Sequence, residues 1–320
     1  MKYLFLLTFS LILFQCSCKR TTDTLGPDAC PSANFKVLSP LVIKDNASSS
    51  ETSLDLSASY AKISAAFNEV ITYKLIVTGQ TSGAVYEYNG KSATIALSWY
   101  GNSTNGKYFK KGELLVYTLT NICKAESIGS GQIMLSTIIG YNGFGFKVVN
   151  FEESPALAMA QYGDFAAGAC AASMKMTPAS PGYEESPQGG NYYRFSSSCT
   201  NAASGKSWYF GGADFTGVNF AALGTDPTRV YLNFFAKGQS NSQAQMIFKE
   251  TLYGSDLTRK FLANVSPGAW TLYSVKLSDI GILDPSKIST LSFNLGAAAY
   301  QDVSASVDLD LVIFTFDKPF

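Results

Sequence analysis

The sequence contains no histidine. Without an imidazole the chain cannot build Ser-His-Asp or Cys-His catalysis, most zinc or copper sites, or a histidine pH switch. Charge is also scarce: charged residues make up 15% of the 320 residues, and the net charge is zero. No basic run is longer than Lys19-Arg20 or Lys110-Lys111. We therefore expect no nucleic-acid partner, because binding phosphates requires concentrated positive charge.

The residues that are abundant favour β-structure. Hydrophobic residues make up 46% of the chain, which has 22 Phe, 18 Tyr and 27 Gly. Aromatic residues favour strands, and glycine favours the turns between them. The length suggests roughly two domains. The sequence therefore predicts an all-β protein with an N-terminal and a C-terminal domain.

Residues 1–18 are typical of an export signal, because their apolar core YLFLLTFSLILF is too short to span a bilayer. The ending Cys16-Ser17-Cys18 resembles the lipobox of bacterial lipoproteins, especially the loose versions of Bacteroidetes, in which a small residue precedes the lipidated cysteine. Cys18 fits this pattern better than Cys16, and cleavage before Cys18 leaves four further cysteines. The alternative is an ordinary secretory signal with two incidental cysteines.

Residues 19–29 are polar and contain Gly26-Pro27, which predicts a flexible tether. Together with a lipidated Cys18, the resemblance implies an outer membrane lipoprotein on the cell surface. No run of acidic residues follows Cys18, so an orientation toward the periplasm stays open.

Residues 30–145 show short strand-like segments separated by turns. Alternation is clearest at 71–79, ITYKLIVTG, in which every second residue is apolar. About seven such segments indicate an immunoglobulin-like or fibronectin-like sandwich. We expect Cys30 to pair with Cys123, and the domain to serve as a spacer.

The remaining residues, 146–320, contain a series of short segments that follow one another in a definite order along the chain. These are VNFE at 149–152, YYRF at 192–195, RVYLNFF at 229–235, AWTLYSVKL at 269–277 and DLVIF at 310–314. The layout resembles the jelly-roll carbohydrate-binding modules, also described as galactose-binding-domain-like folds. In these the first strand carries Phe-Glu and the last reads Asp-x-Val-x-Phe. The resemblance implies a C-terminal β-jelly-roll that binds glycans.

The resemblance also implies a structural calcium ion held by Glu152 and Asp310. The first and last strands of a jelly roll lie close together, and carboxylate oxygens suit a hard cation. A slip of two residues in the match would exchange Asp310 for Asp308. The alternative is that both aspartates face solvent on a half-exposed strand.

Sugar binding needs aromatic faces for stacking and planar polar groups that reach hydroxyls. Alternation predicts that Gln243 and Gln245 lie on the face of their strand opposite to Met246 and Phe248, with Asn233 on a similar face. Single tryptophans are more often core residues than ligand residues. The candidate ligand-binding residues are Tyr192, Tyr193, Arg194, Trp208, Tyr209, Asn233, Gln243, Gln245 and Trp270.

Cys170 and Cys199 are expected to form a second disulfide within the C-terminal domain, so that each half folds by itself. The predicted function is capture of a polysaccharide or oligosaccharide by a non-catalytic lipoprotein, in the manner of those that work beside an outer-membrane glycan importer. One alternative is an adhesive or structural lipoprotein that binds protein partners. Another is a jelly-roll glycosidase or lyase, but Glu184 and Glu185 are adjacent and cannot easily flank one bond.

Overall fold

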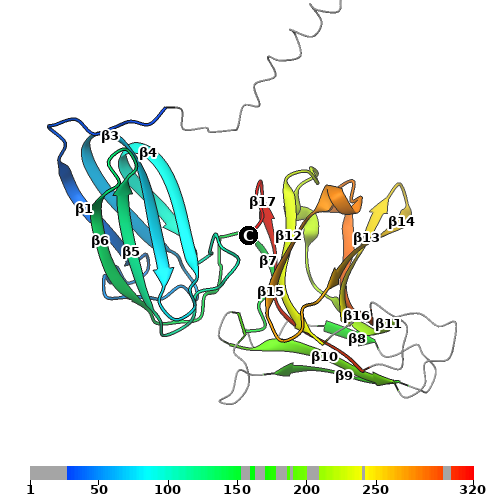
Figure 1. Ribbon diagram of the computed structural model, residues 1–320. Coiled ribbons are helices and arrows are strands. Elements are labelled where there is room, and N and C mark those ends of the chain that lie inside the picture. The colour runs from blue at the N-terminus through cyan, green and yellow to red at the C-terminus, as the bar shows by residue number, and fades with distance from the viewer. Residues whose placement is uncertain are drawn as a thin grey trace, which may run out of the picture.

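The computed structural model describes residues 27–152, 159–162, 170–177, 186–187, 190–199, 209–239, 242–297 and 304–320. The all-β prediction is confirmed: these residues form strands, joined by turns and three short 3-10 helices. Within the described ranges there is no helix that is long and apolar enough to cross a membrane. The strands build two sandwiches that lie side by side (Figure 1).

A single continuous six-stranded sheet, which we call sheet I, forms the first sandwich. Its strands are β1 (Val37–Asp45), β2 (Ser53–Leu54), β3 (Ala61–Gly79), β4 (Val85–Trp99), β5 (Leu114–Asn121) and β6 (Glu126–Leu135). The long strand β3 pairs with β1 through its first half and with β5 through its second half, while β4 follows it along the other edge. Strand β4 runs without a break over 15 residues.

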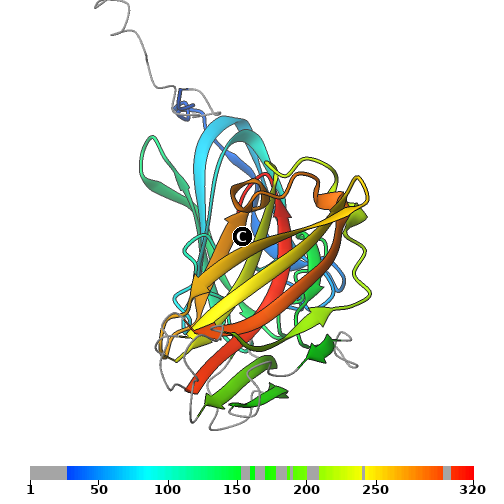
Figure 2. The same ribbon diagram turned by 90° about the vertical axis from the view of Figure 1, so that its right-hand side faces the viewer.

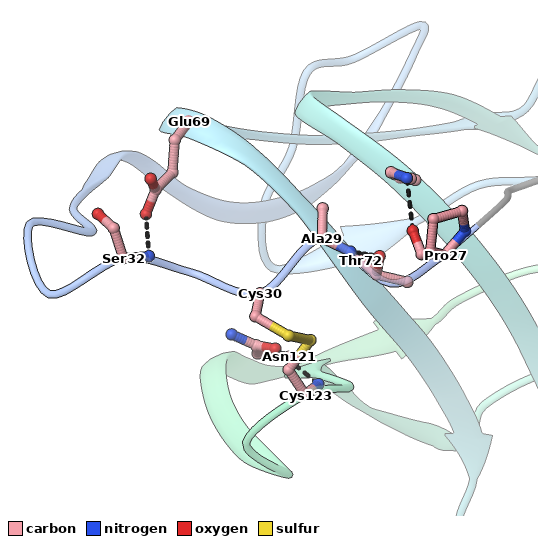
Figure 3. Close-up of a disulfide and its surroundings, with 9 residues drawn as sticks. Pro27, Ala29, Cys30, Ser32, Glu69, Thr72, Asn121 and Cys123 are labelled. Atoms are coloured by element: carbon pink, nitrogen blue, oxygen red, sulfur yellow. Dashed lines mark hydrogen bonds between the residues drawn. A yellow bond between two sulfur atoms is a disulfide. The ribbon is translucent and has the colours of Figure 1, made fainter.

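Alternation explains the core of the first sandwich. Along β3, Leu75 and Val77 are fully buried, and Ile76 between them is half-buried. The predicted disulfide between Cys30 and Cys123 is confirmed, and it ties the segment before β1 to the segment after β5 (Figure 3). Closing a loop with a sequence separation of 93 residues restrains the unfolded chain by about 4 to 5 kcal/mol in the chain-entropy model.

The second sandwich consists of two antiparallel sheets packed face to face around an apolar core. Sheet II has the order β15-β12-β17-β10-β9, with β7 also paired to β17, and sheet III has the order β14-β13-β16-β11-β8. The strands are β7 (Phe146–Val149), β8 (Met159–Tyr162), β9 (Cys170–Thr177), β10 (Tyr192–Cys199), β11 (Tyr209–Phe215), β12 (Val230–Gly238), β13 (Ser242–Leu252), β14 (Ser255–Asn264), β15 (Thr271–Lys276), β16 (Ile288–Ala297) and β17 (Ser304–Phe316). As expected for a jelly roll, the first and last strands are neighbours.

Strand β17 contains a bulge at Leu311 that decides where its two aspartates point. The pairing of β12 with β17 shifts there by one residue, and Leu311 has a φ of 40°. Leu309 and Val312 both belong to the core of the second sandwich. Asp308 and Asp310 therefore lie on the outer face of sheet II, and the bulge places Leu311 on that face as well.

The first sandwich covers part of the outer face of sheet II. Phe235, Leu311 and Ile313 are buried in the same apolar cluster as the core of the first sandwich. Phe235 also packs edge-on against Tyr108, with ring centroids 5.7 Å apart. The C-terminal Phe320 contacts Phe235 from the other side, with a centroid distance of 5.9 Å. The two sandwiches therefore share buried apolar surface, and the role of the first as a spacer stays a prediction.

Candidate functional site

The outer face of sheet III carries the two glutamines that alternation predicted to share a face. Gln243 and Gln245 are half-buried, whereas Met246 and Phe248 are fully buried in the core. In Figure 2 the strands of sheet III lie toward the viewer and the first sandwich lies behind them. This face therefore points away from the first sandwich.

Amide side chains on this face bond to one another across and along the strands. Gln245 Nε2 donates to Gln243 Oε1 (2.9 Å), and Gln243 Nε2 donates to Asn264 Oδ1 on β14 (3.1 Å). On the other side of β13, Asn294 of β16 is the cross-strand partner of Gln245. Each amide has two N–H donors and a carbonyl oxygen, so one contact leaves hydrogen-bonding capacity. Asn294 is itself buried, so we call Gln243, Gln245 and Asn264 the amide face.

The hydroxyl and charged groups around the amide face are also ordered. On the next strand pair, Ser292 Oγ donates to Asp214 Oδ1 (2.5 Å). Further along β13, Lys249 is exposed, and its neighbour in β14, Thr258, is exposed as well. Ser292 is buried, so the accessible donors and acceptors of this outer surface lie on β13 and β14, where they suit a ligand rich in hydroxyl groups.

Asn233 does not belong to this surface, so its prediction as a ligand-binding residue is wrong. Its side chain is fully buried on the outer face of sheet II. Its Nδ2 donates to Thr315 Oγ1 (2.9 Å), and its Oδ1 accepts from Ser274 Oγ (2.6 Å) and from the backbone N–H of Phe320 (3.0 Å). Asn233 thus holds the C-terminus onto sheet II, while the amide face lies on sheet III.

A second group of candidate residues meets on the outer face of sheet II, beside the first sandwich. Arg194 makes a two-point ion pair with Asp308, through Nε to Oδ1 (2.7 Å) and Nη2 to Oδ2 (2.8 Å). Lys237 Nζ lies 3.7 Å from Asp308 Oδ2 and 5.2 Å from the ring centre of Trp270. Tyr192 packs edge-on against Trp270 at 5.5 Å. We call these five residues the junction cluster.

Burial limits what the junction cluster can bind. The side chains of Asp308 and Lys237 are 4% and 8% exposed, and Tyr192 is 1% exposed. Arg194 is more accessible, with a side chain that is 33% exposed, and Trp270 packs against the apolar cluster that the two sandwiches share. The prediction that Tyr192 stacks on a sugar is therefore wrong, because neither face of its ring is open to solvent.

The position of Tyr193 in the structure also contradicts its prediction as a ligand-binding residue. It is 5% exposed and belongs to the core of the second sandwich. Its ring stacks on Phe151 with centroids 5.6 Å apart. Tyr192 and Tyr193 thus point to opposite faces of β10, as successive strand residues must.

Several predicted residues lie partly or wholly outside the described residues. Trp208, Cys18, Glu184 and Glu185 are among these, and of Tyr209 the structure describes the backbone position alone. Cys170 and Cys199 are directly opposite each other in the pairing of β9 with β10. Their disulfide stays a prediction.

Glu152 lies against the backbone that leads into β10. Its carboxylate accepts a hydrogen bond from the N–H of Asn191, and it fits because Gly190 has no side chain: a Cβ there would lie 2.0 Å from Oε2. Its Oε1 is buried, with no hydrogen-bond partner among the described residues. Burial raises the pKa of Glu152 to about 7, despite the opposing hydrogen bond.

Asp310 is buried near the same end of β10. Its neighbour Leu309 is the partner of Tyr193, three residues after Gly190. Asp310 Oδ1 accepts from the N–H of Leu311 (2.8 Å). Burial, and then the charge of Asp310, raise the pKa of Tyr141 in the first sandwich. Asp310 therefore lies where sheet II meets that sandwich.

The described residues supply part of a cation site at most. Nowhere in the ranges that the structure describes do three Asp, Glu, Cys or His side chains meet as metal ligands. The unpartnered oxygen of Glu152 is a suitable hard ligand, so a calcium ion there would need backbone or amide oxygens to complete its six to eight ligands.

Two site residues were missed by sequence reasoning, and each had a signal. Lys237 shares its strand face with Asn233 and Phe235, so alternation along β12 places it on the same side. Asn264 follows from the hairpin of β13 and β14, since counting back from the Tyr253-Gly254 turn pairs it with Gln243.

No family model matches the sequence, and none of the curated proteins matches it. Solved structures of similar shape include a carbohydrate-binding module studied for promiscuous specificity in the β-sandwich superfamily, with 11% identity and a TM-score of 0.36 over 90% of this chain and 99% of that chain. Others are the xylan-binding CBM22-1 domain of Paenibacillus barcinonensis Xyn10C (12% identity, TM-score 0.33, 54% of this chain and 96% of that chain) and the family 30 module of Clostridium thermocellum Cel9D-Cel44B (15%, 0.34, 53% and 97%). These TM-scores are low, so the site rests on the geometry described above.

Proposed function

We propose that this chain is a non-catalytic glycan-binding protein of the cell envelope that holds a polysaccharide or oligosaccharide on the amide face of sheet III. The observation that carries the proposal is the hydrogen-bonded row of Gln243, Gln245 and Asn264 on an outward face. Amides that bond to one another present their remaining donors and acceptors in fixed positions. A ligand with many hydroxyl groups can then bind without ordering each side chain separately.

The dimensions of sheet III suit an extended chain. From Gln243 to Lys249 the outer face of β13 spans about 20 Å at the usual rise of a strand. The neighbouring strand β14 widens this surface on one side with the exposed Asn264, whereas Asn294 on β16 is buried. Such a surface accommodates several sugar residues in line and favours binding along a chain.

Binding to a glycan panel tests the proposal. The probe protein is the chain from residue 19 to 320, because the shared apolar cluster makes the two sandwiches one unit. We expect binding to one or more of cellohexaose, laminarihexaose, xylohexaose and mannohexaose. The double variant Gln243→Ala, Gln245→Ala should weaken that binding by about tenfold or more through lost hydrogen bonds.

The matched control is Gln132→Ala, which removes an exposed amide from strand β6 of the first sandwich. It should bind as the parent chain does. Equal binding by the double variant would contradict the amide face as the site. Silence across sugars, combined with binding to immobilised collagen or fibronectin, would instead favour the adhesive alternative.

The non-catalytic part of the proposal is supported by the lack of histidine and by the engagement of Asp308 with Arg194 and Lys237. Its test is incubation of the parent chain with the same polysaccharides. Release of new reducing ends would overturn it and favour a glycosidase or lyase.

We place the protein on the outer membrane, anchored through lipid on Cys18, with residues 19–29 as the tether and an outer-membrane glycan importer as its partner. Support comes from the sequence of the first 18 residues. Labelling cells with a clickable palmitate analogue should mark the parent protein but not Cys18→Ser. Equal labelling would contradict the anchor, and protease added to whole cells would then reveal which side the protein faces.

We also propose that calcium binds at Glu152 and stabilises the fold, with Asp310 as a second acid nearby. The support is the buried, unpartnered Oε1 of Glu152. A ligand that binds the native state alone raises its stability, so millimolar calcium should raise the melting temperature above that in EDTA. Glu152→Gln should lose this response, and Glu126→Gln, an exposed acid on β6, should keep it. An unchanged melting temperature would contradict calcium binding.

A further inference from the structure

The turn between β13 and β14 carries an aromatic residue in an unfavourable backbone conformation. Leu252 and Ser255 are cross-strand partners, so the loop contains Tyr253 and Gly254 alone. Their φ angles are 52° and 78°. A two-residue loop with both residues left-handed favours Asn-Gly or Asp-Gly, because a residue with a larger side chain is strained there.

The ring of Tyr253 makes no packing contact in the described residues that would offset this backbone strain. The residue is 104% exposed, so its ring packs on nothing in the described part of the chain. Most other aromatic residues of the second sandwich are buried or half-buried. Packing within the described part of the fold therefore does not explain a tyrosine at this position.

The hairpin holds the tyrosine in a defined place. Immediately before the turn, Thr251 Oγ1 donates to Asp256 Oδ1 across the two strands (2.7 Å). Residues 243, 245, 247, 249 and 251 of β13 face outward, and Tyr253 lies in the turn directly after the strand ends at Leu252. Figure 1 places this tip on the side of the second sandwich away from the first. Tyr253 thus stands at the end of the surface that begins with the amide face.

We propose that Tyr253 is a stacking platform for a sugar ring and that it sets a minimum length for the bound glycan. The inference rests on the proposed function, since the amide face must bind the same chain. From Gln245 to Tyr253 the strand spans about 26 Å, so a disaccharide on the amide face cannot reach the ring. An oligosaccharide of several neutral units can, and the hydrogens on one face of a pyranose then pack on the aromatic ring.

The charges along the hairpin have both signs and single out neither an anionic nor a cationic partner. The exposed acid beside the turn is Asp256, and the exposed Lys249 and Lys260 lie further along the same face. The flat, fully exposed ring with a hydroxyl tip is suited to C–H contacts and one hydrogen bond.

The variant Tyr253→Asn separates binding from folding, because asparagine adopts left-handed φ more readily than tyrosine. We expect it to melt at the same or a higher temperature than the parent chain. It should bind the hexasaccharide selected from the four above about tenfold more weakly, and bind the matching disaccharide as the parent does. Tyr253→Phe, which keeps the ring, should retain most of the hexasaccharide affinity.

Leu283→Ala is the control, since Leu283 is 59% exposed and lies outside the hairpin. It should leave both affinities unchanged. If the parent chain binds the hexasaccharide and Tyr253→Asn binds it equally well, the platform is overturned while the amide face stands. If the parent chain binds no sugar, the proposed function fails first. Loss of binding to phosphatidylcholine vesicles in Tyr253→Asn, with sugar binding intact, would also overturn the proposal and assign the ring to a membrane.

Discussion

The outer faces of sheets II and III are built from similar strands but meet different surroundings. On sheet II, Asn233 and Phe235 are 0% and 1% exposed because the C-terminus and the first sandwich cover them. On sheet III, Gln243 and Gln245 are half-buried, and Lys249 is exposed. Alternation assigns residues to a face of a strand, but a face becomes core or binding surface according to what packs on it.

The comparison shows two ways of treating polar groups on a sheet. On the covered face the polar contacts hold parts of the fold together: Asp308 is held by Arg194 and Lys237, and Asn233 by the C-terminal backbone. On the open face the amides bond chiefly to one another. Buried polar groups must be satisfied internally, whereas half-exposed ones keep capacity for a ligand.

The largest expected difference between the faces concerns apolar side chains. Phe235→Ala should lower the free energy of unfolding by about 3 to 5 kcal/mol, because it opens a cavity in the cluster that joins the two sandwiches. Ile247→Ala, which shortens a half-buried side chain on the outer face of sheet III, should cost about 1 kcal/mol. Urea denaturation measures both. Equal losses would mean that the first sandwich does not cover sheet II in solution.

Removal of a charge from the covered face should have the next-largest effect on the free energy of unfolding. Asp308→Asn leaves the positive charges of Arg194 and the buried Lys237 without their carboxylate, which should cost about 3 kcal/mol. Asp317→Asn is the matched control, since Asp317 makes a similar two-point pair with Arg229 in which both side chains are exposed. Exposed pairs contribute little, so its unfolding midpoint in urea should barely move. Similar shifts for the two variants would show that the junction cluster is hydrated.

The sequence predicted the local parts of this molecule and missed those that depend on distant segments. Alternation was enough to place Gln243 and Gln245 opposite Met246 and Phe248, and cysteine pairing was enough for Cys30 with Cys123. The predicted position of Asn233 was wrong because Phe320, whose backbone N–H bonds to it, comes from the end of the chain. Local patterns carry no information on such docking.

Strand β17 shows the same limit within one element. Its sequence indicates a strand with two acids, but a single left-handed residue, Leu311, shifts the alternation after them. A bulge forms where pairing with β12 and packing against the first sandwich require it, and neither is visible in the residues themselves. For the same reason, sequence alone could not show that Asp308 pairs with Arg194.

The same chemical change on the two faces provides the finest test of the comparison. Asn233→Ala removes an amide that bonds Ser274, Thr315 and the backbone of Phe320, so the loss should be about 2 kcal/mol, from partners left unpaired in the interior. Gln245→Ala should change stability by less than about 0.5 kcal/mol, because its neighbours can bond to water instead. Sugar affinity should follow the reverse order, falling for Gln245→Ala and holding for Asn233→Ala under conditions where both variants are folded. Reversal of either order, measured by urea denaturation and by titration with the selected hexasaccharide, would mean that the two faces have been assigned the wrong roles.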